Sequence, residues 1–210
     1  VLTHELMSQY ESENNHVGFV TLDVPFNFSQ IVNFGVQNSE AVHVVLMNND
    51  IEVINSDWLE SMLEHSQRPD VGAVGAKLYY PDDTIQHAGI AIGIGSYAGH
   101  PHKHVEGGYS GYLNRLHNIQ NVSAVTGAMM MVKRESYNSV EGFDERLFKI
   151  ACNDVDFCLR LRSQGLLNIF TPYARAYHHE SVSRGYEDTP EKKARFDKEV
   201  DAFRKRHGES

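Results

Sequence analysis

A short apolar run that stops at three polar residues places the strongest constraint on how this chain folds. Residues 42–47 are mostly apolar and β-branched, and Asn48, Asn49 and Asp50 follow them directly. Such a run predicts a buried strand with a carboxylate at its carboxyl end. Ligands bind at that edge in open α/β sheets, so Asp50 can reach a divalent cation that carries a diphosphate. A polar turn without any ligand is the alternative explanation.

A second acidic motif opens a segment of helical periodicity. Asn153, Asp154 and Asp156 are interleaved with apolar residues at 155, 157–159 and 161, which predicts a helix over residues 153–162. Asp154 falls in its first turn, where the helix dipole favours negative charge. Asp156 is spaced to pair with Arg160 at i,i+4. The alternative is a capping cluster with a solvated salt bridge.

Strands and helices alternate along the rest of the chain. We predict strands at residues 17–22, 71–78, 125–132 and 174–179, and a helix over 31–36 with Ser29 as its N-cap. A further helix runs through His65, with Ser56 and Asp57 as candidate caps. This alternation predicts an α/β fold with a mostly parallel, doubly wound sheet. Residues 190–206 are strongly charged, with Ala194, Phe196, Val200 and Phe203 on one helical face. A peripheral helix packed on the domain is preferred to a partner-binding or membrane-surface helix, because its charges are mixed in sign.

The long glycine-rich stretch 79–121 interrupts this pattern. Long loops of this kind are uncommon without a function, so we expect a lid on the side of the site where a second substrate, the acceptor, would bind. An irregular surface insert is the alternative. His100, His102 and His104 alternate within it and would share one face of a strand. A transition-metal site is one reading, but the triplet has no carboxylate at a fixed offset.

Composition limits the class of protein. The chain has 210 residues, of which 41% are hydrophobic, enough for one sizeable core. Its net charge of −9 argues against a general nucleic-acid binder. Cys152 and Cys158 are the two cysteines and lack a zinc-ligand spacing, so we expect reduced thiols in a cytoplasmic protein. There is no apolar run of membrane-spanning length and no signal peptide pattern.

Several motifs, in order along the chain, resemble those of inverting family-2 glycosyltransferases of the GT-A fold. The resemblance runs from about Val17 nearly to the end of the chain. The motifs that carry it are residues 26–29, 33–35, 47–53, 58–59, 68–78, 84–89 (Thr-Ile-Gln-His-Ala-Gly), 153–160 (Asn-Asp-Val-Asp-Phe-Cys-Leu-Arg) and 177–185 (Tyr-His-His-Glu-Ser-Val-Ser-Arg-Gly).

The resemblance implies a role for each candidate site residue. Asp154 would be the general base, and Asp50 with one of two neighbouring histidines, His178 in preference to His179, would hold Mn²⁺ or Mg²⁺. The further residues implied in donor or acceptor binding are Asn48, Asn49, Thr126, Gly127, Asn153, Asp156, His179 and Arg184. For Arg184, which would help to neutralise the diphosphate, a solvated surface arginine is an equal alternative. For residues 129–131, packing of a core strand by adaptable methionines is the alternative to a pocket floor.

The chain departs from the family pattern at three places. Asn153 stands where many relatives have Glu, and Asn48 where many have Asp, but both motifs keep their last aspartate. We therefore expect the essential carboxylates to survive, with weaker metal binding where a neutral amide replaces a ligand. Glu141, before Gly142, stands where a glycine is common, which we expect to loosen a turn rather than to change the chemistry.

By resemblance, the chain is a glycosyltransferase domain over residues 1–189 with a C-terminal charged helix at 190–210. We expect transfer from a nucleotide-diphosphate sugar to a glycan or lipid-linked acceptor in cell-surface polysaccharide synthesis, at the inner membrane face if membrane-associated assembly machinery is the partner. The first residue is not Met, so we expect a fragment that lacks the first βαβ segment of the nucleotide-binding half. A metal-dependent phosphohydrolase or pyrophosphorylase, and a non-catalytic nucleotide-sugar-binding fragment, are the alternatives.

Overall fold

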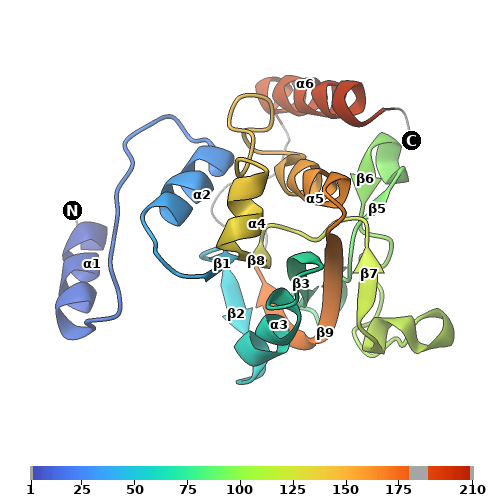
Figure 1. The fold of residues 1–210 in the computed structure, drawn as a ribbon, viewed down its shortest axis with the longest axis horizontal. Helices are drawn as coiled ribbons and strands as arrows, with labels where there is room; N and C mark the ends of the chain where they lie inside the picture. The colour runs from blue at the N-terminus through green and yellow to red at the C-terminus, as the bar shows by residue number, and fades with distance from the viewer. Residues whose placement is uncertain (1, 180–188, 209–210) are drawn as a thin grey trace.

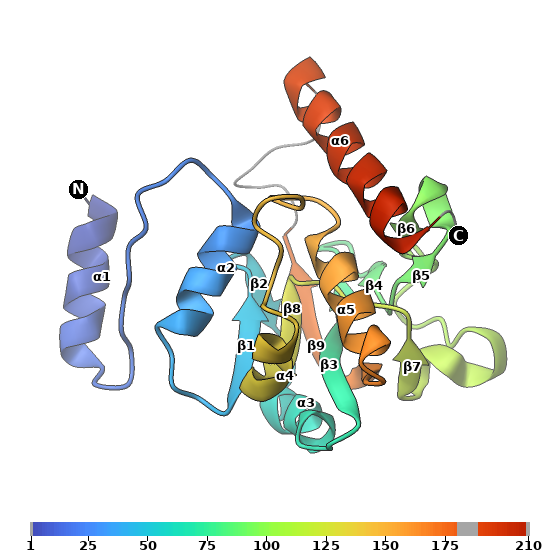
Figure 2. The ribbon, with the colours of Figure 1, turned by 45° about the horizontal axis from the view of Figure 1, so that its top comes forward.

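The structure is a computed structural model that describes residues 2–179 and 189–208. A central sheet separates two layers of helices (Figures 1 and 2). The helices are α1 (Leu2–Glu13), α2 (Phe28–Gln37), α3 (Trp58–Ser66), α4 (Arg134–Ser139), α5 (Asn153–Ser163) and α6 (Pro190–His207). The strands are β1 (His43–Met47), β2 (Ile51–Val53), β3 (Val71–Tyr79), β4 (Ile85–His87), β5 (Ala91–Ile92), β6 (Ala98–Gly99), β7 (Gln120–Val122), β8 (Met129–Lys133) and β9 (Leu167–His178). The predicted α/β class with a sheet flanked by helices is confirmed.

The sheet is mixed in strand direction. Its order is β1-β8-β3-β9-β2, with β4 paired to β3 and β7 paired to β9. The long strands β3 and β9 run parallel, whereas the other pairings described for this sheet are antiparallel. This differs from the mostly parallel pattern expected from the sequence, because alternation along the chain does not reveal which strands become neighbours.

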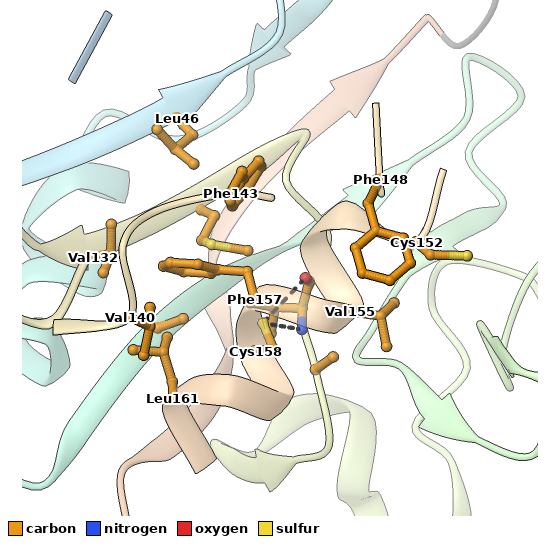
Figure 3. Close-up of a cluster of buried hydrophobic side chains, with 14 of the residues drawn as sticks. Leu46, Val132, Val140, Phe143, Phe148, Cys152, Val155, Phe157, Cys158 and Leu161 are labelled. Carbon is orange, nitrogen blue, oxygen red and sulfur yellow. Dashed lines mark hydrogen bonds between the residues drawn. The ribbon is translucent and has the colours of Figure 1, made fainter. Parts of the chain in front are cut away.

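Alternate residues of β8 fill the two sides of the sheet. Met129 and Met131 pack with Met62 of α3 on one face. Met130 and Val132 join the cluster formed by α2, α5 and α6 on the opposite face. Figure 3 shows this second cluster, in which Phe143, Phe148 and Phe157 lie around α5. The interpretation of residues 129–131 as a core strand is therefore correct. Side chains of a strand alternate between the two faces of the sheet, so each methionine is buried in one of the two core clusters.

Two helices begin where their sequences favour an N-terminus. Asn27 caps α2, because its side chain accepts a hydrogen bond from the Gln30 N–H at 3.1 Å. The predicted cap Ser29 is instead buried in the first turn and donates to the carbonyl of Phe148. Thr189 caps α6 in the same way as Asn27 caps α2, accepting from the Lys192 N–H at 3.3 Å.

The C-terminal helix packs on the body of the molecule. Val200 and Phe203 of α6 are buried in the same cluster as Phe148 and Val155, while Ala194 is exposed. In Figures 1 and 2, α6 lies along the outer side of α5, and α1 stands apart from the sheet beyond α2. Residues 17–22, predicted as a strand, have no regular structure, and Phe19 and Val20 among them are exposed.

The long stretch 79–121 holds short elements instead of one open loop. Its strands β4, β5 and β6 accompany two 3₁₀ turns, at Ile94–Ser96 and Tyr112–His117. Lys77 of β3 is buried beneath it and donates to the carbonyls of Gly107 at 3.3 Å and Leu116 at 3.5 Å. This lysine therefore ties the stretch to the sheet.

Candidate functional site

A single cavity collects most of the predicted site residues. Its volume is about 1180 Å³, and its walls come from α2, β1, residues 126–128 just before β8, the end of β9, the start of α5 and the start of α6. The predicted residues that line it are Asn48, Asn49, Asp50, Thr126, Gly127, Asn153, Asp154 and His178. The polar turn after β1 and the first turn of α5 therefore meet at one place, although about 100 residues separate them in the chain.

Asp154 is held by backbone donors at the start of α5. Its Oδ2 accepts from the Gly127 N–H at 3.0 Å and its Oδ1 accepts from the Val155 N–H at 2.8 Å. Gly127 lies close enough that a Cβ there would sit 3.5 Å from the Cβ of Asp154. The carboxylate keeps further lone pairs, since each oxygen can accept two hydrogen bonds. It is therefore oriented and still able to accept a proton.

The chain enters α5 through a strained residue. Cys152, which precedes the helix, has φ 60° and ψ −3°, a left-handed conformation that side chains other than glycine rarely adopt. Asn153 is buried, and its side chain spans the turn: Nδ2 donates to the Ile150 carbonyl at 3.1 Å, and Oδ1 accepts from the Asp154 N–H at 2.7 Å. Strain of this kind concentrates at functional sites.

His178 and Asp50 form the second half of the site. Their Nε2 and Oδ1 atoms lie 3.1 Å apart, at the end of β9 and just after β1. The backbone fixes this approach, because Ile51 pairs with His178 and the His179 N–H donates to the Asp50 carbonyl at 3.0 Å. Asn48 Nδ2 lies 3.3 Å from the same Nε2 atom. The side chains of Asp50 and His178 are 17% and 11% exposed, so both are largely buried at the edge of the cavity.

The hydrogen bonds of His178 fit a metal ligand. Nδ1 lies 2.7 Å from Gln86 Oε1, an acceptor, so a neutral His178 carries its proton on Nδ1 and presents a lone pair on Nε2. Asp50 Oδ1 is buried and has no hydrogen-bond partner. Two ligand atoms at right angles around a cation with bonds of roughly 2.1 Å lie about 3.0 Å apart, which is close to the observed separation. The pair is thus suited to hold a divalent cation.

Two side chains of the strongest ligand types, Asp50 and His178, meet at this place. Among residues 2–179 and 189–208 there is no group of three or more His, Cys, Asp or Glu side chains that could hold a metal ion. A cation held by Asp50 and His178 would take further ligands from a bound molecule, from water or from an amide oxygen of the cavity wall. Mg²⁺ and related cations are commonly held by one or two side chains together with phosphate oxygens.

Three predicted site residues are not found in the cavity: two lie elsewhere in the fold, and one falls outside the residues that the structure describes. His179 is turned away from the cavity and its Nε2 lies 3.1 Å from Glu52 Oε2. Asp156 does not line the cavity but is fully buried between Arg160, Arg206 and His207. The predicted i,i+4 pair of Asp156 with Arg160 is confirmed at 2.8 Å, although it is buried instead of solvated. Arg184 falls outside the described residues.

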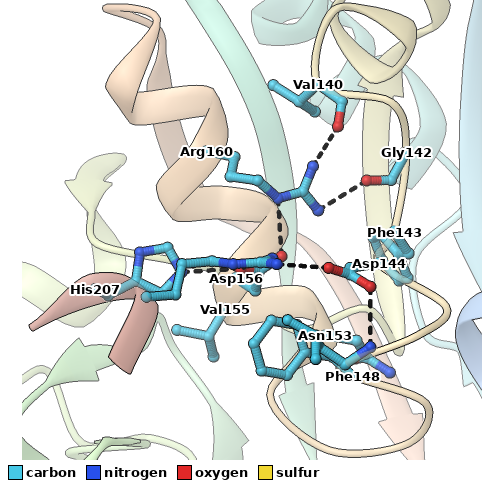
Figure 4. A network of polar contacts seen from close by, with 12 residues as sticks. Val140, Gly142, Phe143, Asp144, Phe148, Asn153, Val155, Asp156, Arg160 and His207 are labelled. Carbon is cyan, nitrogen blue, oxygen red and sulfur yellow. Dashed lines mark hydrogen bonds and ion pairs between the residues drawn. The ribbon is translucent and has the colours of Figure 1, made fainter. Parts of the chain in front are cut away.

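Figure 4 shows what Asp156 does instead. One of its oxygens receives Arg160, which also donates to the carbonyls of Val140 and Gly142. The other oxygen receives His207 at 2.8 Å and Arg206 at 3.0 Å, both from the last turn of α6. Asp156 therefore joins α5, α6 and the loop before α5, two residues from Asp154.

The three histidines of the His-rich stretch do not share a face. Residues 101–104 form turns, so the alternation that a strand would give is absent. His100 Nδ1 lies 3.0 Å from His87 Nδ1, and the ring of His104 stacks on Tyr80 at 4.8 Å. Burial, followed by the charge of His100, lowers the pKa of His87 well below its ordinary value. The structure thus gives His100 and His104 separate packing roles.

Sequence reasoning missed several walls of the cavity. Lys192 and Arg195 of α6 line it, although that helix was expected to be only peripheral. Their i,i+3 spacing on one helical face is the signal that was available. Phe28 and Val32 of α2 line the cavity as well, which makes one wall apolar. Gln86, whose side chain contacts His178, belongs to the motif at residues 84–89, but the sequence alone assigned it no role.

Both cysteines are buried and free of disulfides. Cys158 Sγ lies 3.5 Å from the Val125 N–H and 3.7 Å from its carbonyl oxygen. Burial raises the pKa of both thiols. In the part of the chain that the structure describes, no helix has the length and apolar character needed to cross a bilayer.

Two known proteins are similar to this chain over most of its length. No family model matches the chain. It is 48% identical over 204 residues to the uncharacterised protein y4gI of Sinorhizobium fredii, covering 97% of this chain and 22% of that protein. It is 40% identical over 173 residues to the O-antigen biosynthesis protein RfbC of Myxococcus xanthus, covering 82% of this chain and 14% of that protein. The chain thus spans about a fifth or less of the length of these relatives.

A shorter match points in the same direction. Over 64 residues, 30% of the chain, it is 38% identical to an N-acetylglucosaminyl-diphospho-decaprenol L-rhamnosyltransferase of Mycobacterium tuberculosis, and the match covers 20% of that enzyme. The named sequence relatives therefore include an O-antigen biosynthesis protein and a rhamnosyltransferase.

Solved structures show the fold. GalNAc-T7 with UDP, GalNAc and Mn²⁺ matches with a TM-score of 0.70 and 14% identity, over 90% of this chain and 37% of that one. The mannosyltransferase PcManGT of Pyrobaculum calidifontis, in complex with GDP-Man and Mn²⁺, matches with a TM-score of 0.64 and 15% identity, over 99% of this chain and 52% of that one. The chain has a GT-A-like glycosyltransferase fold.

Proposed function

We propose that this chain carries the catalytic core of a metal-dependent, inverting glycosyltransferase of family 2. Its substrates are a nucleotide-diphosphate sugar and a hydroxyl group of a glycan or lipid-linked saccharide. The fold shared with structures that hold nucleotides and Mn²⁺ supports this proposal, as do the O-antigen and rhamnosyltransferase relatives. Fold alone does not imply function, so the argument rests on the site.

One observation carries the proposal. The oriented carboxylate of Asp154 and the Asp50–His178 pair line the same cavity. A general base and a cation site in one cavity are the two parts that an in-line displacement with a diphosphate leaving group requires. A volume of about 1180 Å³ is large enough for a small-molecule ligand with several rings.

Asp154 takes the proton in the proposed step. An acceptor hydroxyl oxygen forms the new bond to the anomeric carbon while the bond from that carbon to the diphosphate oxygen breaks. The hydroxyl proton passes to a carboxylate oxygen of Asp154, and the electron pair leaves with the diphosphate. Attack from the face opposite the leaving group inverts the anomeric configuration. The Gly127 N–H keeps the carboxylate aimed throughout, at 3.0 Å.

Asp50 and His178 would hold Mn²⁺ or Mg²⁺, and such a cation would supply positive charge to balance the departing diphosphate. Asn48 and Asn49 line the cavity beside this pair. Lys192 and Arg195 add positive charge to the cavity wall, which would favour a diphosphate or another anionic ligand. Thr126 and Gly127 line the cavity beside Asp154, where a small side chain lets a sugar approach the backbone.

The cellular setting follows from the same relatives. An O-antigen biosynthesis protein and a rhamnosyltransferase named for a decaprenol-linked acceptor support a role in cell-surface polysaccharide synthesis. We place the catalytic core in the cytoplasm, at the inner face of the membrane, where such an acceptor would meet a nucleotide-activated donor.

A nucleotide screen tests the donor site. Thermal unfolding is measured with UDP, GDP, dTDP and CDP, each with and without Mn²⁺. A nucleotide at about a hundred times its dissociation constant adds roughly 2.7 kcal/mol to the free energy of unfolding. We expect one nucleotide to stabilise the chain only when Mn²⁺ is present, and EDTA to remove the effect. Stabilisation by none of them would contradict a donor pocket in this chain.

Neighbouring histidines provide the matched comparison. His178→Ala is expected to abolish the Mn²⁺-dependent stabilisation, whereas His179→Ala, whose ring contacts Glu52 outside the cavity, is expected to retain it. Product analysis with the corresponding nucleotide sugar then tests the reaction. Transfer to an added saccharide supports the proposal, and release of phosphate or sugar phosphate without an acceptor would indicate a phosphohydrolase instead.

A further inference from the structure

The side chain of Gln86 reaches across the sheet to the imidazole of His178. Gln86 belongs to β4, and β4 and β9 pair with the same residues of β3, Leu78 and Tyr79. Gln86 is 6% exposed. Its Oε1 lies 2.7 Å from His178 Nδ1, and its Nε2 donates to the His178 carbonyl at 3.5 Å. One amide therefore contacts both the ring and the backbone of the same residue.

This contact decides which ring nitrogen carries the proton. An amide oxygen can only accept, so a neutral His178 bonded to it must carry its proton on Nδ1. In the other tautomer, Nε2–H would donate to Asp50 Oδ1 at 3.1 Å. That hydrogen bond would satisfy the buried Asp50 oxygen, which otherwise has no partner, and would occupy the two atoms that a cation needs. Gln86 thus opposes a pairing that would close the metal site.

The strand that carries Gln86 is fixed independently of the site. The Ile85 N–H donates to the Val105 carbonyl at 2.7 Å, and the His104 N–H donates to the Ile85 carbonyl at 2.8 Å. On the other side of Gln86, His87 is fully buried, and its Nε2 accepts from the Gly89 N–H at 3.3 Å. Since both neighbours of Gln86 are held, the amide is a preorganised partner for His178.

We propose that Gln86 is a positioning residue, which holds His178 in the Nδ1–H tautomer so that Nε2 faces Asp50 as a cation ligand. The proposal rests on the metal site of the proposed function. It assigns a role to the Thr-Ile-Gln-His-Ala-Gly segment, whose glutamine acts on the site through His178 without lining the cavity. A second partner that orients a ligating imidazole is a general requirement of metal sites.

The test reads the histidine ring directly. Long-range ¹H–¹⁵N spectra of the metal-free chain report the tautomer of His178, with the signals assigned by comparison with His178→Ala. Titration with Mn²⁺ alone then broadens the same signals as the cation binds. The variants are Gln86→Leu, which removes the acceptor, and Gln86→Glu, which keeps one. Asn168→Leu is the matched control, since Asn168 is a buried amide of β9 that donates to the Ser123 and Cys158 carbonyls.

We expect wild-type His178 to show the Nδ1–H tautomer and Gln86→Leu to show a shift toward Nε2–H. The Mn²⁺ concentration needed for half-maximal broadening should rise 10–100-fold in Gln86→Leu, as for other partners of metal ligands. Gln86→Glu should restore the wild-type tautomer and Mn²⁺ response. Asn168→Leu should lower the unfolding temperature without changing either.

The outcomes separate this inference from the proposed function. If the spectra of the wild-type chain show His178 in the Nε2–H tautomer, Gln86 does not have the proposed role. This result needs no variant, so it decides the question even if none of the variants folds. Equal Mn²⁺ responses in wild type and Gln86→Leu would overturn the role of Gln86 while leaving the metal site intact. A loss of Mn²⁺ response in Asn168→Leu as large as in Gln86→Leu would show a general structural effect and overturn it as well. No broadening of wild-type His178 by Mn²⁺ would refute the metal site itself, and the inference with it.

Discussion

Arg206 Nη1 lies 3.0 Å from Asp156 Oδ1, although 50 positions separate the two residues in the chain. Arg206 also contacts Asp144 at 2.6 Å, so one guanidinium joins two carboxylates of different segments. The contact ties the last turn of α6 to the first turn of α5, which carries Asp154 (Figure 4). A helix that the sequence marks as peripheral is therefore coupled to the candidate active site.

Replacing Asp156 with Asn should strongly destabilise the chain. Asp156 is fully buried, and the change would leave Arg160, Arg206 and His207 without their shared counter-charge. Removing one partner of a buried pair costs about 3–5 kcal/mol. Urea unfolding measures the loss. Asp201→Asn is the control, since that carboxylate is 64% exposed and lies 3.5 Å from Arg204. Equal, small losses in both variants would contradict a structural role for the network.

The same network predicts a pH dependence. Burial alone would raise the pKa of Asp156, but the hydrogen bond from His207 and the charges of Arg160 and Arg206 outweigh it and lower the pKa. A lowered folded-state pKa stabilises the fold above the unfolded pKa of about 3.9, and this contribution is lost as the pH falls through the folded-state pKa. The difference in unfolding free energy between wild type and Asp156→Asn should therefore shrink as the pH falls below about 4. A difference that grows on acidification would have the wrong sign.

Glu141 provides a prediction of the opposite kind. It has φ 60°, so the glutamate holds a left-handed turn where glycine is favoured. The left-handed conformation costs a residue with a Cβ about 1–2 kcal/mol. Glycine avoids this cost, but it lowers the free energy of unfolding by roughly 0.5–1 kcal/mol relative to alanine, because its unfolded chain is more flexible. Glu141→Gly should thus raise the unfolding free energy slightly. Glu135→Gly, inside α4, should lower it by about 1 kcal/mol. If both changes lower it equally in urea unfolding, the turn is not strained.

Elements with their own periodicity were predictable from the sequence. The runs that became β1 and β3 and the helical patterns of α5 and α6 carry their signal within a few residues. Residues 17–22 looked equally strand-like but have no regular structure, because a strand also needs a partner that local sequence does not specify. β9 begins at Leu167 and not at Ala174, since it continues past Pro172 with a shift of register against β3. Such an irregularity is where a sheet tolerates proline.

The site was predictable where a polar motif follows a strong apolar pattern. Asp50 after β1 and Asp154 at the start of α5 both reach the cavity. Asp156, two residues after Asp154, turns away from the cavity, because residues two apart do not share a helix face. The Gln86–His178 contact joins positions 92 residues apart and depends on strand order, so no local pattern reveals it.

Replacing Asp154 with Asn isolates its chemistry from its place in the fold. The amide oxygen can still accept from the Gly127 N–H, now at 3.0 Å from Oδ2, so the first turn of α5 should keep its geometry. An amide cannot take the acceptor proton, and loss of a general base costs about 10²–10⁴-fold in rate. Sugar transfer should therefore fall at least a hundredfold, whereas the Mn²⁺-dependent stabilisation by nucleotide should persist. Asp70→Asn, an exposed aspartate paired with Arg68, should leave both unchanged. A variant that keeps more than about a hundredth of wild-type transfer would remove Asp154 as the base, because a rate that survives its neutralisation does not depend on proton transfer to it.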